Sequence, residues 1–141
     1  MSDPFGLQRF VQAQDDGGTY DQAMRELRAG RKHSHWMWFV FPQVAGLGSS
    51  PMAQHYAISG LPEARAYLAH PELGRRLVEC ARALADLDTA DPERVFGPVD
   101  AQKLRSSMTL FAQAAPDEPA FRQVLDRYFD GAEDDATVSR L

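Results

Sequence analysis

Three short segments of the chain carry the residue types that most readily contact a small ligand. The first is the aromatic block at residues 35–43, which begins with His35, contains Trp36 and Trp38, and ends at Gln43. A tryptophan ring can stack on a planar ligand, and buried indole N–H groups and glutamine amides need hydrogen-bond partners that a ligand can supply. The alternative is that this block forms hydrophobic core, which is the usual role of clustered aromatic side chains.

The second segment is a glycine-rich stretch in which Gly46 and Gly48 precede Ser50. Two glycines allow neighbouring backbone N–H groups to point together, and a helix predicted to start at Pro51 would add partial positive charge at its N-terminus. These features make the stretch a candidate anion site. The spacing matches neither the P-loop nor the dinucleotide-binding fingerprint, so an ordinary turn followed by a helix N-cap is the alternative.

The third segment contains Lys103, Ser106 and Ser107 within a predicted helix. Residues three and four positions apart lie on one helix face, so all three side chains are expected to be neighbours. A lysine beside a hydroxyl could activate a nucleophile or hold a phosphate, although the familiar Ser-x-x-Lys order is reversed here. The alternative is a pair of small residues at a helix contact with a surface lysine beside them.

The four histidines, His33, His35, His55 and His70, and the single cysteine, Cys80, follow no metal-binding spacing. Cys80 falls in an apolar helical seam, and no histidine or acidic residue can be assigned to it as an activating partner. The sequence therefore predicts no metal site and no cofactor, and it assigns no catalytic residue.

The composition is that of an ordinary globular protein. Hydrophobic residues make up 44% and charged residues 25% of the 141 residues, a length close to the commonest size of one domain. Lys and Arg number 15, against 20 Asp and Glu. Because nucleic acids carry dense negative charge, this acidic balance predicts that the chain has no nucleic-acid partner.

Three features predict a cytoplasmic protein. With Cys80 as the single cysteine no internal disulfide can form, which suits a reducing compartment. The first residues lack a basic segment followed by an apolar one, so no signal peptide is expected. The longest strongly apolar run, residues 36–41, is far shorter than the roughly 20 residues that span a bilayer, so no membrane segment is expected.

The candidate residues must be positioned by helices. Helix caps, Gly and Pro stops and apolar residues at helical spacing recur along the chain, without strand–helix alternation or an internal repeat. The pattern predicts one compact all-α domain of about seven or eight short helices over residues 1–141, with a folded core at 3–130 and a mobile polar tail at 131–141. Expected helices cover residues 4–14, 19–29, 36–41, 51–58, 61–70, 71–87, 100–115 and 119–129, with a further turn at 92–96.

Four blocks of the chain together resemble one protein family. They are residues 30–43 (GRKHSHWMWFVFPQ), 56–58 (YAI), 63–71 (EARAYLAHP) and 103–111 (KLRSSMTLF). The chain is similar to a bacterial family of unknown function, number 1810 among domains of unknown function, whose members are sometimes labelled calpastatin. The resemblance implies an all-helical fold and supplies no activity, substrate or catalytic residue. Inhibitors called calpastatin are long, repetitive and disordered, so that label does not suit this short, aromatic-rich chain.

Two functional hypotheses follow from the sequence. In the first, the protein binds or acts on a small anionic ligand, nucleotide- or phosphate-like, in a pocket that combines Trp36 or Trp38, the 46–50 loop and Lys103. This hypothesis requires the three segments to meet at one concavity. In the second, the chain is a non-catalytic protein-interaction module with a large exposed apolar patch and no polar-lined pocket. The residues alone leave open whether the protein is an enzyme and which partner it has.

Overall fold

The computed structural model describes residues 3–141 and shows an all-α fold, as the sequence pattern predicts. Within that range no β-strand forms, and the one β-type contact is an isolated bridge between Val44 and Ile58. The helices are α1 (Gln8–Asp15), α2 (Thr19–Ala29), α3 (Met37–Val40), α4 (Pro51–His55), α5 (Leu61–Ala69), α6 (Leu73–Ala85), α7 (Pro92–Ala114), α8 (Pro119–Phe129) and α9 (Asp135–Val138), with a 3₁₀ turn at Asp16–Gly18 between α1 and α2.

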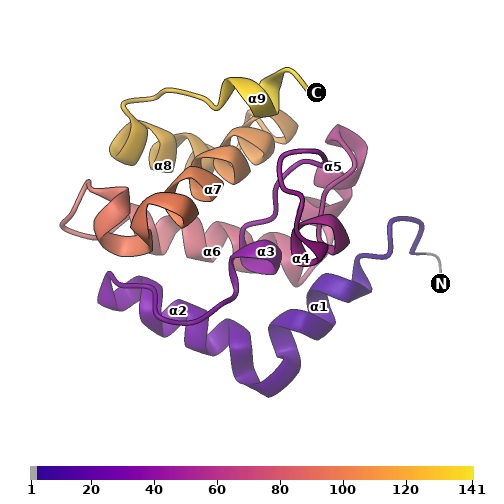
Figure 1. Ribbon diagram of the computed structural model, residues 1–141, viewed down its shortest axis with the longest axis horizontal. Helices are drawn as coiled ribbons and strands as arrows, with labels where there is room; N and C mark the ends of the chain where they lie inside the picture. Colours follow the sequence, from indigo (N-terminus) through magenta and orange to yellow (C-terminus); the bar gives the residue numbers. More distant parts are fainter. Residues whose placement is uncertain (1–2) are drawn as a thin grey trace.

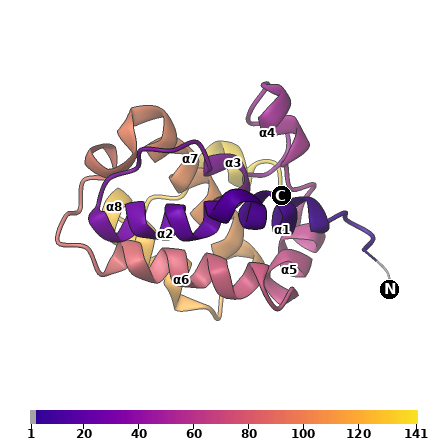
Figure 2. The ribbon, with the colours of Figure 1, turned by 90° about the horizontal axis from the view of Figure 1, so that it is seen from below.

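The helices pack around α6 and α7, which cross the middle of the molecule (Figure 1). Helix α8 contacts both of them, α2 packs on α6, and α9 packs on α7. Figure 1 shows α1 and α2 along one edge and α8 and α9 along the opposite edge. Seen from below, α4 projects from the body of the fold on the side where α3 lies (Figure 2). No helix of residues 3–141 is long and apolar enough to cross a membrane.

The core is continuous from the first helix to α8. The apolar seam predicted for α6 is buried at Leu73, Leu77, Cys80 and Leu84. These side chains belong to one cluster with apolar residues of α7 and α8 and with the aromatic block. The fully buried aromatic side chains of this cluster are Phe10, Trp36, Phe41, Tyr67, Phe111 and Phe121. The core interpretation therefore holds for most of the aromatic block, as its residue types favour.

Helix α7 joins two segments, the turn at 92–96 and the helix at 100–115, that the sequence pattern predicts as separate elements. Residues 92–96 form its first turn, capped by the Asp91 side chain, which accepts hydrogen bonds from the backbone N–H groups of Glu93 and Arg94. Gly97 then adopts a left-handed φ of 78°, and Pro98 follows it. Because a left-handed residue costs little only for glycine, the helix can turn here and resume toward Lys103.

The polar C-terminal segment differs from the mobile tail that its composition predicts. Asp134 and Thr137 are buried, and α9 rests on α7. The Asp134 carboxylate accepts hydrogen bonds from the Ser106 hydroxyl at 2.8 Å and the Thr137 hydroxyl at 2.6 Å, while its backbone N–H donates to Thr109 at 2.9 Å. Composition misleads here because a few polar side chains, rather than apolar ones, attach this segment to the fold.

Candidate functional site

The site is a pocket of about 370 Å³ between α3, the 43–50 loop, α4 and the middle of α7, which we call the Trp38 pocket. Most of its walls are apolar, and Lys103 is the one charged side chain among the described residues that line it. Such a volume suits a small organic molecule, since ligand pockets span roughly 300–1,000 Å³. The lining residues are Met37, Trp38, Phe41, Gln43, Val44, Ala45, Gly46, Gly48, Ser49, Ser50, Ala53, Gln54, Ala57 and Lys103.

One wall of the pocket is held in place by Glu26, a buried carboxylate on α2. It accepts hydrogen bonds from the backbone N–H groups of His33 and Ser34 at 2.7 and 2.9 Å, and from the Ser34 hydroxyl at 2.6 Å. The indole N–H of Trp36 donates to the same carboxylate at 3.0 Å. These bonds fix the chain that leads into α3, so Trp36 faces the core while Trp38 lines the pocket.

The environment of Glu26 also fixes its charge. Burial by itself raises the pKa of this carboxyl, but the hydrogen bonds from Ser34 and His33 and from the Gln22 side chain outweigh burial and hold the pKa well below its usual range. Glu26 is therefore ionised at neutral pH. Its lone pairs are used by groups of the protein, which makes it a structural anchor.

The opposite wall forms where two loop segments pair. The Ile58 N–H donates to the Gln43 carbonyl and the Ala45 N–H donates to the Ile58 carbonyl, both at 2.8 Å. This pairing produces the Val44–Ile58 bridge and places Ala57 in the pocket lining. The backbone of Gln43 is thereby fixed, while no hydrogen bond reaches its side-chain amide from any residue between 3 and 141.

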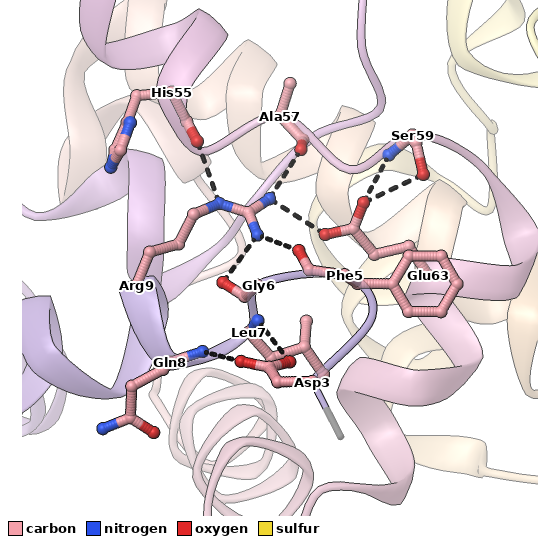
Figure 3. Close-up of polar contacts among 10 residues, drawn as sticks. All are labelled: Asp3, Phe5, Gly6, Leu7, Gln8, Arg9, His55, Ala57, Ser59 and Glu63. Carbon is pink, nitrogen blue, oxygen red and sulfur yellow. Dashed lines mark hydrogen bonds and ion pairs between the residues drawn. The ribbon is translucent and has the colours of Figure 1, made fainter. Parts of the chain in front are cut away.

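Arg9 of α1 holds residues 55–59, which include one side of this pairing, to the body of the protein (Figure 3). Its guanidinium donates to the carbonyls of His55 and Ala57 at 2.9 and 3.0 Å, and it forms an ion pair with Glu63 at 2.9 Å. The Glu63 carboxylate, in turn, accepts hydrogen bonds from the Ser59 N–H and hydroxyl, both at 2.9 Å. A planar guanidinium can serve several fixed acceptors at once, so Arg9 sets the path of residues 55–59 beside the pocket.

The glycines of the loop have structural reasons to be glycine. Gly46 has a left-handed φ of 96°, and the Arg140 guanidinium lies where a side chain would project. A Cβ on Gly48 would lie 2.6 Å from the Cβ of Ala53. The Ser50 hydroxyl accepts the Ala53 N–H at 3.1 Å, so it serves as the N-cap of α4, a helix of five residues. These contacts favour the turn-and-cap interpretation of this loop over a phosphate cradle.

Lys103 approaches the pocket from α7. Its ammonium lies 5.3 Å from the centre of the Trp38 ring, within the range of a cation–π contact. Asp100 lies 3.7 Å away, but the other oxygen of that carboxylate is only 2.9 Å from the ammonium of Lys32. Lys103 therefore brings positive charge to an otherwise uncharged pocket.

The structure brings together six of the ten residues that the sequence indicates for ligand binding. Trp38, Gln43, Gly46, Gly48, Ser50 and Lys103 all line the Trp38 pocket. The other four lie elsewhere. His35 is exposed outside the pocket, and Trp36 is buried in the core with its N–H bonded to Glu26.

The two serines near Lys103 have no ligand-facing role in the Trp38 pocket. Ser106 donates to the Asp134 carboxylate and lies in a neighbouring hollow beneath α9. Ser107 is fully buried, and its hydroxyl has no hydrogen-bond partner within residues 3–141. Burial raises the pKa of Asp134 by itself, but the hydrogen bonds from Thr137 and Ser106 outweigh it and lower the pKa. An ionised carboxylate of low basicity is a poor base, so the pair does not resemble an activated nucleophile.

Two positioning residues, Glu26 and Arg9, were not predicted from the sequence. A signal for Glu26 existed, because it lies beside Leu27 on the buried side of an amphipathic helix. The role of Arg9 depends on acceptors about 50 residues away, which no local pattern shows. Among the described residues, no group of three or more His, Cys, Asp or Glu side chains is placed to hold a metal ion.

Comparisons with known proteins place the chain in a family. The chain is similar to the conserved hypothetical protein Rv1873 from Mycobacterium tuberculosis, for which a crystal structure is known. The two sequences are 52% identical and the structures agree with a TM-score of 0.95, over 99% of this chain and 98% of Rv1873. No curated protein matches the chain. The family model described as "Protein of unknown function (DUF1810)" matches residues 4–141, essentially the whole length. The chain therefore belongs to the DUF1810 family, to which no function is assigned.

Proposed function

We propose that this protein binds a small ligand with a planar apolar part and an anionic group in the Trp38 pocket. The observation that carries the proposal is the Lys103 ammonium over the Trp38 ring, in a pocket whose remaining lining is uncharged. The ring offers a flat apolar surface, and the ammonium over it offers a positive charge. A ligand with both features can satisfy both contacts at once.

The composition of the pocket argues for a ligand of modest charge. A polyphosphate is usually held by several backbone N–H groups or several cations. Here the two glycines are required by the tight path of the loop, and the Ser50 hydroxyl caps α4. Helix α4, with five residues, is too short to contribute a substantial dipole. Among nucleotide- and phosphate-like molecules, the pocket therefore favours compounds with one anionic group over nucleoside triphosphates.

The interaction-module hypothesis has less support. Among residues 3–141 the large exposed apolar side chains are Met52, Val99, Val138 and Leu141. They come from α4, α7, α9 and the final residue, so no single helix of the described chain presents a stripe of large exposed apolar side chains. The polar-edged pocket is the feature that this hypothesis does not predict. A cytoplasmic location and the lack of a nucleic-acid partner stay predictions from composition.

A thermal-shift screen tests the proposed function. Aromatic carboxylates, aromatic phosphates and nucleotides are each added to the purified protein, and Tm is measured. A ligand present at 100 times its Kd adds about 2.7 kcal/mol to the free energy of unfolding, a shift of several degrees for a domain of this size. We expect aromatic monoanions to raise Tm and neutral analogues of the same shape to have a smaller effect.

Variants locate any ligand that the screen identifies. Trp38→Leu and Lys103→Met should abolish the shift, with circular dichroism to verify that each variant is folded. His35→Ala is the matched control, because this neighbouring side chain is exposed outside the pocket. The proposal fails if His35→Ala removes the shift as completely as Lys103→Met does, or if folded protein gives no shift with any aromatic anion.

A further inference from the structure

Two lysines share one carboxylate at the edge of the pocket. The ammonium of Lys32 lies 2.9 Å from one oxygen of Asp100, and the ammonium of Lys103 lies 3.7 Å from the other oxygen. Lys103 lines the pocket and Lys32 does not. Each lysine also faces a tryptophan: Lys32 lies 5.1 Å from the ring centre of Trp36, and Lys103 lies 5.3 Å from that of Trp38.

The distances and exposures assign Asp100 mainly to Lys32. The Lys32 side chain is 8% exposed, whereas that of Lys103 is 29% exposed. Coulombic attraction strengthens as charges approach and as solvent is excluded, and both conditions favour the contact with Lys32. The backbone N–H of Lys32 also donates to the carbonyl of Val95 at 2.8 Å, which anchors Lys32 to the first turn of α7. The Lys103 ammonium, 3.7 Å from Asp100, is left with a long and weak ion-pair contact.

We infer that Lys32, by occupying Asp100, keeps Lys103 available to a carboxylate-bearing ligand in the Trp38 pocket. Lys32 is thus a positioning residue that acts through Asp100 without reaching the ligand. The inference rests on the proposed function, which it deepens by naming the anionic group. Without Lys32, the Asp100 carboxylate would draw the Lys103 ammonium to itself and away from the pocket.

A carboxylate fits the donors that the pocket offers. Lys103 is the charged donor, and the side-chain amide of Gln43, with no hydrogen-bond partner among residues 3–141, is a neutral one. One ammonium and one amide can each serve one oxygen of a carboxylate. A phosphate dianion carries more charge and more acceptor oxygens than these two groups can match.

Binding of 2-naphthoate and of its neutral counterpart 2-naphthamide tests the inference. We expect Lys32→Met to weaken 2-naphthoate binding about fivefold and Asp100→Asn to strengthen it about threefold, as a changed ion-pair contact of partly buried groups allows. The Kd of 2-naphthamide should change little in either variant. Each variant removes the ion pair between Lys32 and Asp100 and lowers stability, so the opposite directions of the two effects on Kd separate the inference from general damage to the fold.

The double variant Lys32→Met/Asp100→Asn completes the test. Its Kd for 2-naphthoate should return to the wild-type value or below it, because the competing carboxylate is gone. The inference is overturned if Lys32→Met and Asp100→Asn change the Kd in the same direction, or if neither changes it. The proposed function fails differently: wild-type protein then binds neither compound, or Lys103→Met binds 2-naphthoate as tightly as wild type does.

A second measurement needs no ligand. Sulfosuccinimidyl acetate acetylates free lysine amines, and peptide mass spectrometry gives the rate at Lys103. An ammonium paired with a carboxylate reacts more slowly, so acetylation of Lys103 should slow in Lys32→Met and quicken in Asp100→Asn. Unchanged rates in both variants, or rates that move together, would overturn the inference whether or not any naphthyl compound binds.

Discussion

At the scale of single residues, two adjacent serines on α7 are in opposite situations. Ser106 donates a hydrogen bond to the buried Asp134 carboxylate, whereas the fully buried hydroxyl of Ser107 has no partner within the described chain. An unsatisfied buried polar group costs roughly 1–3 kcal/mol, and a bond to a charged group contributes about 1.5–3 kcal/mol. Alanine substitutions at the two positions therefore form a matched pair with opposite expected effects on stability.

We expect Ser107→Ala to raise the free energy of unfolding by about 0.5–1 kcal/mol and Ser106→Ala to lower it by about 1–2 kcal/mol. Urea denaturation of the two variants beside the wild type measures both differences. Destabilisation by Ser107→Ala as large as that by Ser106→Ala would contradict the assignment of Ser107 as a buried hydroxyl without a hydrogen-bond partner.

Glu26 gives the protein a pH-dependent contribution to its stability. Its folded-state pKa lies below the ordinary value of 4.5 because the hydrogen bonds that it accepts outweigh the effect of burial. A carboxyl whose pKa is lowered on folding stabilises the protein above its unfolded pKa, and this contribution is lost as the pH falls toward the folded value. We expect Glu26→Gln to cost about 2–3 kcal/mol at pH 7, and less below pH 4.5.

Urea denaturation of wild type and Glu26→Gln at pH 7, 5.5 and 3.5 measures that dependence. The difference between the two proteins should be equal at the two higher values and smaller at the lowest. A difference that is constant over the whole range would mean that folding does not lower the pKa of Glu26, which contradicts this account.

At the scale of elements, α1 supports the pocket through Arg9, although α1 contributes no residue to the lining. The Arg9 guanidinium reaches the 55–59 segment and Glu63 at the same time (Figure 3). Lysine keeps the charge but not the planar fork, so Arg9→Lys cannot make these contacts together. We expect this variant to lower the free energy of unfolding by about 2 kcal/mol and to quicken amide exchange at Ile58.

Arg65→Lys is the control for Arg9→Lys, because Arg65 is exposed on α5 and makes no hydrogen bond or ion pair within residues 3–141. It should leave both stability and exchange within experimental error of the wild type. Equal behaviour of the two variants would contradict the role of Arg9 as the attachment of the 55–59 segment.

At the scale of the whole molecule, the helices were predictable because their signals are local. Gly30 ends α2 in a left-handed conformation, Ser50 and Pro51 start α4, and the α6 seam follows from helical spacing. The pocket was predictable in its residue types, since Trp38 and Lys103 stood out in the sequence. Which tryptophan faces it was not predictable, because Glu26 makes that choice through contacts between separate elements.

Contacts between separate elements also explain why the packing of the C-terminal segment was not predicted. Its composition is polar, and polar segments usually stay in solvent, but two partners of Asp134, Ser106 and Thr109, lie on α7 about 30 residues earlier. Attachment by a few polar side chains leaves no apolar periodicity for a sequence pattern to detect. Ser106, one of the residues that hold this segment, therefore looked like a candidate for chemistry or for helix packing.

The most direct test of the proposed pocket is a ¹H–¹⁵N NMR titration of the protein with 2-naphthoate. The chain has two tryptophans, so two indole N–H resonances report on the two sides of the aromatic block. The Trp38 resonance and the amides of residues 43–50 should shift with saturation, while the Trp36 resonance, bonded to Glu26 in the core, stays in place. Shifts at Trp36 without shifts at Trp38, or shifts confined to residues outside the pocket, would contradict the assignment of this site.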